Sequence, residues 1–330
     1  MATGPPSSPF WVPVSQTTSS STAATPSTSQ TRRSKPSTTW DGTTPLWSSP
    51  ALAGQTARAS RAEETGQRRH PHDLARLLSD VQSHGVRAAK RGAFDDADVD
   101  ALAWALLGDD PAATVSTLDR ALDEGANYEQ TARAVAYAAG LRLVRFHTQN
   151  DHGDWDVVHH AFTAASAVHQ LIRRAADPQL ARAIYQGAMK VYLDRFLNIP
   201  PARLPDQIPD PGGEPDLTAL QPCWDQEGQV DEAGAIVWRW IRSGRPTADA
   251  VAALGSALLA EDPEFHWYQT VEAAVQQARA WPDGSEQAAL LLAGAARFLA
   301  AHTPTRRELA QVVRIATRLR RGEALFEDAG

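Results

Sequence analysis

The sequence has very little cysteine and no long apolar run. Cys223 is the single cysteine among 330 residues, which excludes a disulfide within the chain and any cluster or zinc site built from several of its own thiolates. No apolar stretch approaches the roughly 20 residues that a membrane-spanning helix needs. The formal net charge of −7 at pH 7 lacks the basic excess of a general nucleic-acid binder. We therefore expect a cytoplasmic protein that binds neither nucleic acid nor membrane.

Most motifs with a known mechanism are missing as well. The chain contains no P-loop, no G-x-G-x-x-G, no G-x-S-x-G and no HExxH. The aspartate-rich run FDDADVD (94–100) resembles the magnesium motif of terpene cyclases. Such an enzyme also needs a second set of three ligands, Asn, Ser and Glu, on another helix. Asn150 could begin this set, but Asp154 stands at the Ser position and Val158 at the Glu position, so the set is incomplete. We interpret Asp95 and Asp96 as ordinary acids at the start of a helix.

Residues 1–69 differ in composition from the rest of the chain. Ser, Thr and Pro make up about half of residues 1–66, and such a segment buries too little apolar surface to offset its ordering entropy. It also lacks the apolar stretch of a secretory signal. We expect this segment to be disordered.

From residue 70 to residue 330 the pattern is helical. Alanine and leucine recur at helical spacing, and no stretch alternates with the period of a strand. The Pro-rich stretch 199–217 interrupts this pattern and divides the region into possible halves, 70–198 and 218–330. We predict an all-α multi-helix bundle with helices near 72–90, 96–108, 111–124, 128–148, 154–176, 178–198, 229–243, 247–260, 263–281, 285–302 and 305–321.

Helix starts are marked by acidic residues. Asp110-Pro111 and Asp262-Pro263 each place an acid before a proline, which is typical of a first helical turn. Asp154 is a good N-cap for the helix that follows the turn near Gly153. We expect all three aspartates to begin helices.

Histidines are concentrated in one segment. Five of the ten lie between residues 147 and 169, in FHTQNDHGDWDVVHHAFTAASAVHQ. Asp156 and His160 are four residues apart and share a helix face, whereas His159 belongs to a second stripe. Because neighbouring residues of a helix differ by about 100° in direction, we expect only one of His159 and His160 to face a site. The other packs or meets solvent.

Two kinds of chemistry fit these residues. His147, Asp156 and His160 could bind a divalent metal, since two histidines and one carboxylate with open positions suit non-haem iron. Alternatively, Asp156 could orient the imidazole of a metal-free acid–base pair, with His147 or His160 transferring protons. His266, in the block AEDPEFHWYQ, is a fourth candidate ligand if the two halves pack face to face. A purely structural role for each histidine is the competing interpretation.

Three blocks of sequence carry a family resemblance: FHTQNDHGDWDVVHHAFTAASAVHQLIRR, YQGAMKVYLDRFLNIPPARLP and LLAEDPEFHWYQTVEAAVQQ. Together they resemble a helical family from actinobacteria that often accompanies a Rieske iron–sulfur domain. The shorter run from His160 to Ala167 is distantly similar to questin oxidase-like proteins. The resemblance implies an oxidoreductase in which His147, His160 and His266 match the family's histidines. A Rieske cluster needs two cysteines, so this chain holds none and electrons must come from a separate redox partner protein.

The sequence thus predicts an oxidoreductase or oxygenase that acts on an apolar or aromatic small molecule. In this hypothesis His147, Asp156 and His160 are the catalytic residues, and together with His266 they are the metal ligands. Iron is the first expectation for the metal. The alternative is a non-catalytic helical scaffold or ligand-binding partner of a separate redox protein.

Overall fold

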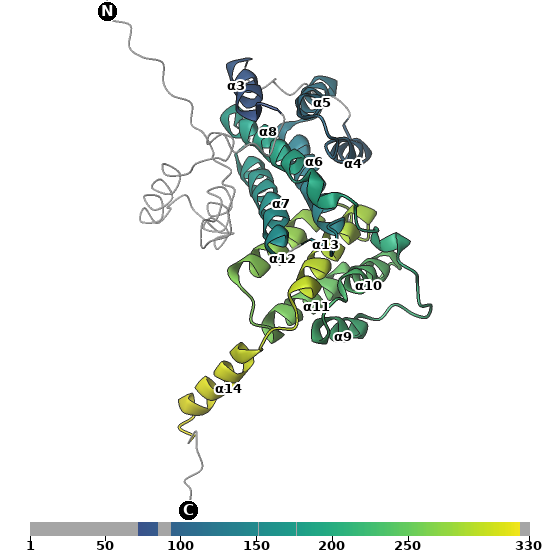
Figure 1. Ribbon diagram of the computed structural model, residues 1–330, viewed down its shortest axis with the longest axis vertical. Coiled ribbons are helices and arrows are strands. Elements are labelled where there is room, and N and C mark those ends of the chain that lie inside the picture. The colour runs from purple at the N-terminus through teal and green to yellow at the C-terminus, as the bar shows by residue number, and fades with distance from the viewer. Residues whose placement is uncertain (1–71, 85–93, 151, 176, 324–330) are drawn as a thin grey trace, which may run out of the picture. The chain divides into compact units, whose positions relative to one another are not determined.

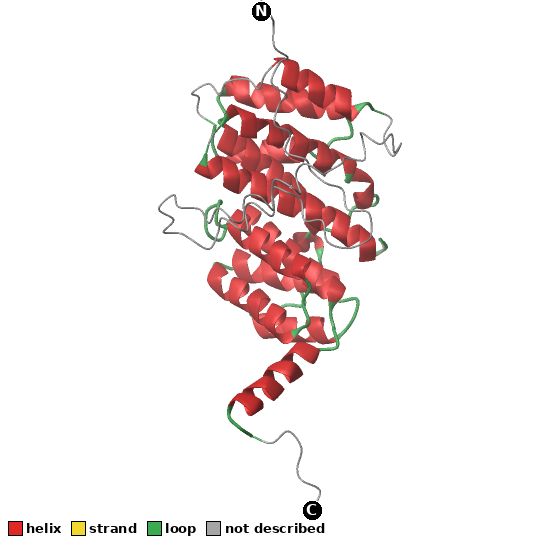
Figure 2. Cartoon of the chain, turned by 90° about the vertical axis from the view of Figure 1, so that its left-hand side faces the viewer, coloured by secondary structure: helices red, strands yellow, loops and turns green. Residues whose placement is uncertain are grey.

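The computed structural model describes residues 72–84, 94–150, 152–175 and 177–323 (Figure 1). These residues form twelve α-helices, α3 to α14, and contain no strand (Figure 2). The predicted all-α class is therefore confirmed, and the eleven expected helices correspond to α3–α8 and α10–α14. The expectation that 1–69 is disordered lies outside the described residues. None of the described helices combines the length and the apolar character that crossing a membrane requires.

The chain divides into two compact units, and two of the three boundaries between them fall inside continuous α-helices. The first unit comprises the described residues up to Ala139 together with His160–Arg195. The second comprises Gly140–His159 and the described residues from Phe196 onward. The halves expected from the sequence, 70–198 and 218–330, differ from this division because Gly140–His159 and residues 196–198 belong to the second unit.

The first unit is a group of helices with well-defined caps. The Asp95 carboxylate accepts hydrogen bonds from the amides of Ala97 and Asp98, so the aspartate-rich run is a helix start. Asp110 caps α5 with Pro111 as its first residue, as predicted. The unit contains α3 (Leu74–His84), α4 (Asp96–Ala105), α5 (Pro111–Glu124), most of α6 (Tyr128–Val144), most of α7 (His152–Arg174) and α8 (Pro178–Leu193).

The second unit is built around two closely packed helices, α10 and α13 (Figure 1). Gly234 of α10 faces Arg297 of α13 so closely that an added Cβ would lie 2.8 Å from the arginine Cγ. The buried Arg297 guanidinium pairs with Asp231 and donates to the Phe146 carbonyl oxygen. The unit contains α9 (Leu220–Asp225), α10 (Val230–Arg242), α11 (Thr247–Ala260), α12 (Phe265–Ala278), α13 (Glu286–His302) and α14 (Glu308–Arg320), with short 3₁₀ turns at Arg195–Asn198, Pro205–Gln207 and Leu217–Ala219.

Two predicted helix starts are wrong. Asp262 does cap a helix, but its carboxylate accepts from the amides of Glu308 and Leu309 at the start of α14, while α12 begins at Phe265. Helix α7 begins at His152, so Asp154 lies within its first turn instead of capping it. Both aspartates lie at a helix start, as an acidic residue should. For Asp262 tertiary packing decides which helix it caps, and for Asp154 the helix starts two residues earlier than predicted.

Candidate metal centre

Helix α7 is buried all the way round over its middle. Every residue from Val158 to Gln170 is buried, although this stretch includes three histidines. Four alanines in the same stretch favour the helix, and Arg173 and Arg174 in the last turn complement its dipole. A helix enclosed on all sides can direct histidines from two of its faces into the protein interior.

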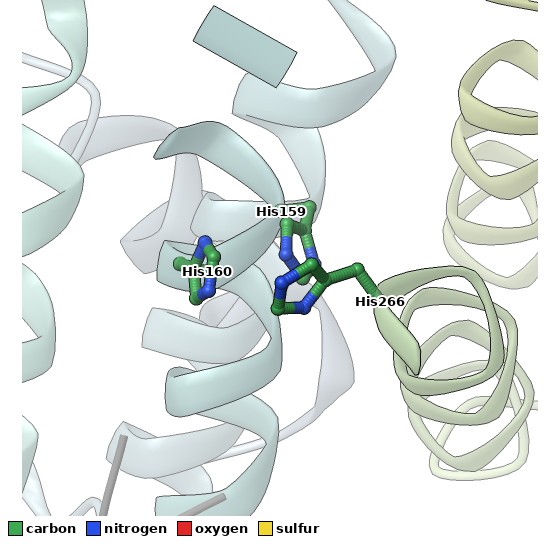
Figure 3. A group of neighbouring side chains, drawn as sticks. All are labelled: His159, His160 and His266. Atoms are coloured by element: carbon green, nitrogen blue, oxygen red, sulfur yellow. The ribbon is translucent and has the colours of Figure 1, made fainter. Parts of the chain in front are cut away.

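His159 contacts His266 within the second unit. The two ring centroids are 4.6 Å apart, and Figure 3 shows the His266 ring reaching from α12 to the His159 ring. His159 has no exposed surface, whereas His266 is half-buried near the start of α12. Two imidazoles from helices far apart in the sequence therefore meet at one place.

Hydrogen bonds to α12 decide which nitrogen of each ring carries the proton. The Thr270 hydroxyl donates to the His266 carbonyl oxygen at 2.9 Å, so its oxygen accepts from Nδ1 of His159 at 3.1 Å. The Gln269 amide oxygen lies 3.2 Å from Nδ1 of His266 and accepts from it. Since both rings donate through Nδ1, both hold their lone pair on Nε2. Hydrogen bonds of this kind, made by the nitrogen that faces away from the ion, orient histidines as metal ligands.

His160 adds a third imidazole. It follows His159 directly on the continuous helix α7, so its place beside His159 follows from the helix itself. Only 6% of His160 is exposed. One ligand nitrogen from each of His159, His160 and His266 lies within 4.8 Å of the other two. The expectation that only one of His159 and His160 faces inward is therefore wrong, because α7 is buried on both faces.

The spacing of these nitrogens is close to what a metal needs. Three imidazole nitrogens at about 2.05 Å from a tetrahedral ion are about 3.3 Å apart. The group must contract by at most about 1.5 Å from its 4.8 Å limit to reach that geometry.

Aromatic side chains border the histidine pair. The Phe298 ring lies 5.6 Å from that of His159, and the Phe265 ring lies 6.0 Å from that of His266. Trp155 and Trp267 both make edge contacts with the ring of His302, which also stacks against Phe298. Aromatic rings thus border the imidazoles, with the buried Phe298 on the side of His159 and the half-exposed Phe265 on the side of His266.

The group contains two of the four ligands that the sequence predicted. His160 and His266 belong to it, whereas His147 and Asp156 do not. Nδ1 of His147 instead accepts from the Gln149 amide at 3.1 Å in the turn after α6. The roles of His147 and Asp156 as ligands or catalytic groups remain predictions.

Sequence reasoning assigned no role at the site to His159 and Thr270. The stripe of Trp155, His159, Phe162, Ser166 and His169 is buried throughout, and this apolar-flanked stripe was the signal that His159 faces inward. Thr270 offered no signal in the sequence, because it meets the ring of His159, which lies 111 residues away.

Comparisons with models of protein families, with curated proteins and with solved structures find no match. The assignment of the centre rests on its residues and their hydrogen bonds.

Proposed function

We propose that the protein is a metal-dependent oxidoreductase whose divalent transition metal is bound by His159, His160 and His266. The observation that carries this proposal is the convergence of three imidazole nitrogens within 4.8 Å, two of the rings donating through Nδ1 to polar groups of α12. In this assignment His159 and His266 bind through Nε2. Thr270 and Gln269 hold the two rings in the ligating tautomer.

The ligand set bears on the choice of metal. Imidazole suits copper, zinc, iron and nickel, and affinity for nitrogen donors rises toward copper along the first row. With three imidazoles in place of the expected two and a carboxylate, copper becomes as good a candidate as iron. Either ion supplies the one-electron chemistry that an oxidoreductase needs.

The surroundings of the centre favour an apolar or aromatic small molecule as substrate. The rings of Phe298 and Phe265 flank the histidines and offer contact area without hydrogen-bonding demands. Electrons would come from a separate redox protein, because a chain with one cysteine cannot build a cluster of its own.

A non-catalytic role is the second candidate, and the burial of the histidines favours it. His159 is fully buried and His160 is 6% exposed, so protein surrounds two of the three ligands. A metal enclosed in this way would join α12 to α7 as a structural clamp, without an open coordination position for substrate.

Metal analysis of the full chain tests the proposed ligand set. Wild type, His266→Ala and His147→Ala are purified without chelators, reconstituted with copper, iron or zinc, and analysed for metal per chain. We expect about one ion in wild type and in His147→Ala, and a loss of at least tenfold in His266→Ala. Loss in His147→Ala with retention in His266→Ala would favour the ligand set predicted from the sequence. Absence of metal from wild type would end the proposal.

Exogenous ligands then distinguish the enzyme from the clamp. Azide added to the copper-loaded protein should change its electron paramagnetic resonance spectrum if a coordination position is open. An unchanged spectrum would show a closed site and would favour the structural clamp.

A further inference from the structure

Helix α14 is fixed firmly at its beginning. Both oxygens of the Asp262 carboxylate accept backbone amides there, from Glu308 at 2.7 Å and from Leu309 at 2.6 Å. Arg307, directly before the helix, donates to the buried Glu261 carboxylate at 2.7 Å and to the Trp224 carbonyl oxygen at 3.1 Å. This network holds the helix in one direction relative to the rest of its unit.

The body of the same helix is exposed. In both views α14 extends away from the other helices of the second unit (Figures 1 and 2). Its large apolar residues are 38–57% exposed: Leu309, Val312, Val313, Ile315 and Leu319. Of these, Leu309, Val312 and Leu319, together with Ala316, follow the 3-4-3 spacing of a coiled-coil seam. A rigidly held helix with an exposed apolar seam is suited to pairing with another helix.

Charge is distributed unevenly along the helix. Around its beginning three carboxylates reach the surface, those of Asp225, Asp262 and Glu308. They outnumber the two arginines there, Arg306 and Arg307. Toward its end lie Arg314, Arg318, Arg320 and Arg321, with Glu323 as the only nearby acid among the described residues. The acidic beginning and the basic end are complementary to each other.

We propose that α14 pairs antiparallel with α14 of a second copy of this chain. Antiparallel pairing places Leu309 opposite Leu319 of the second copy, and Val312 opposite its Ala316. It also brings the arginine-rich end of each helix beside the acidic beginning of the other. Parallel pairing would place the two arginine-rich ends together, which like-charge repulsion disfavours.

The expected dimer is weak. A helix of 13 residues is about 20 Å long, so one helix pair buries less than the roughly 1,200 Å² of a standard interface. The association should therefore depend on protein concentration. Because opposite charges meet, salt should weaken it, whereas salt would strengthen a parallel pair by screening repulsion.

Sedimentation equilibrium of the full chain over a hundredfold range of concentration tests the proposal. We expect a monomer–dimer equilibrium whose dissociation constant rises at least tenfold in Leu319→Glu and stays within twofold in Gln311→Glu. The second variant adds the same charge to the polar face of the same helix and is the matched control. A chain that stays monomeric, or a dimer that Leu319→Glu leaves unchanged, would overturn the proposal. A monomer that binds phosphatidylserine vesicles through α14 would assign the face to a membrane instead.

Cysteine cross-linking tests the direction of pairing. A mixture of Leu309→Cys and Leu319→Cys chains should form a mixed disulfide dimer, while Leu319→Cys alone should form little. Cys223 does not compete, because burial and the nearby Glu232 raise the pKa of its thiol to about 11. Efficient cross-linking of Leu319→Cys alone would show parallel pairing and contradict the proposal.

Discussion

Two buried histidines of the same helix have different surroundings. His159 and His169 lie on one stripe of α7 and have no exposed surface. In the first unit, Nε2 of His169 lies 2.9 Å from the Glu129 carboxylate. In the second unit, Nδ1 of His159 donates to the Thr270 hydroxyl, and its ring lies 4.6 Å from that of His266.

The difference decides what each ring can do. A carboxylate is an acceptor, so Nε2–H of His169 donates a hydrogen bond to Glu129, and that nitrogen is occupied. For His159 the acceptor binds Nδ1, and Nε2 keeps the lone pair that a metal requires. Burial and helical spacing are the same for both residues. The partner contributed by another helix therefore separates a structural histidine from a candidate ligand.

The largest expected effect comes from replacing each histidine by the amide side chain that keeps its hydrogen bond. The amide nitrogen of Asn occupies the place of a histidine Nδ1, so His159→Asn keeps the hydrogen bond to Thr270 and removes the ligand atom. The amide nitrogen of Gln occupies the place of Nε2, so His169→Gln keeps the hydrogen bond to Glu129. We expect the metal content to fall at least tenfold in His159→Asn and to stay near wild type in His169→Gln.

Elemental analysis of both variants, with circular dichroism as the control for folding, measures this difference. Equal metal content in the two folded variants would remove the distinction between the histidines. Loss of metal in His169→Gln alone would place the centre near His169, toward the C-terminal end of α7.

A smaller effect is expected from the group that orients His159. Thr270→Val keeps the shape of the side chain but removes the oxygen that accepts from Nδ1. Metal affinity should fall about 10–100-fold, since the ring loses its fixed tautomer. Thr131→Val is the matched control, because the buried Thr131 hydroxyl bonds to carbonyl oxygens of its own helix region, those of Asn127 and Tyr128. Competition titrations with a metal indicator give both affinities, and equal values would exclude an orienting role for Thr270.

The fold could be predicted from the sequence because its signals are local. Asp110-Pro111 starts α5 and Gly125 ends it with φ 116°, both as the residue types require. The short helix α9 was missed, since six residues after a Pro-rich stretch carry too little periodicity. Asp262 was assigned to the wrong helix because the amides it caps lie 46 and 47 residues further along the chain.

The site could be predicted only in part. The density of histidines near His160 indicated the correct helix, and His266 was recognised in a separate block. His160 was chosen and lies in the group, but His159, which lies there too, was left out, because a helical wheel shows directions but not which faces are covered. Asp156 was favoured as a ligand from its spacing alone, whereas the contact between the rings of His159 and His266 depends on how α12 packs on α7 within the second unit. The contact that completes the group is therefore tertiary, and no local pattern reports it.

The smallest effect concerns the hydrogen bond between His169 and Glu129. The hydrogen bond from His169 lowers the pKa of the Glu129 carboxyl, against a smaller opposing effect of burial. A carboxyl with a lowered folded-state pKa stabilises the fold above its ordinary value of 4.5, and this contribution is lost as the pH falls through the folded-state pKa. Because 37% of the Glu129 side chain is exposed, solvent screening reduces the contribution to about 0.5–1 kcal/mol.

Glu129→Gln should therefore lower the free energy of unfolding at neutral pH by about that amount, and the difference from wild type should shrink as the pH falls below the ordinary carboxyl value. Urea unfolding of both proteins across this range measures the change, with metal content as the control that the second unit is unaffected. A difference that grows on acidification would have the wrong sign for a carboxyl whose pKa the fold lowers. It would mean that the contact with Glu129 does not stabilise the fold and that other groups hold the His169 ring. The contrast in partners between His169 and His159 would then be lost.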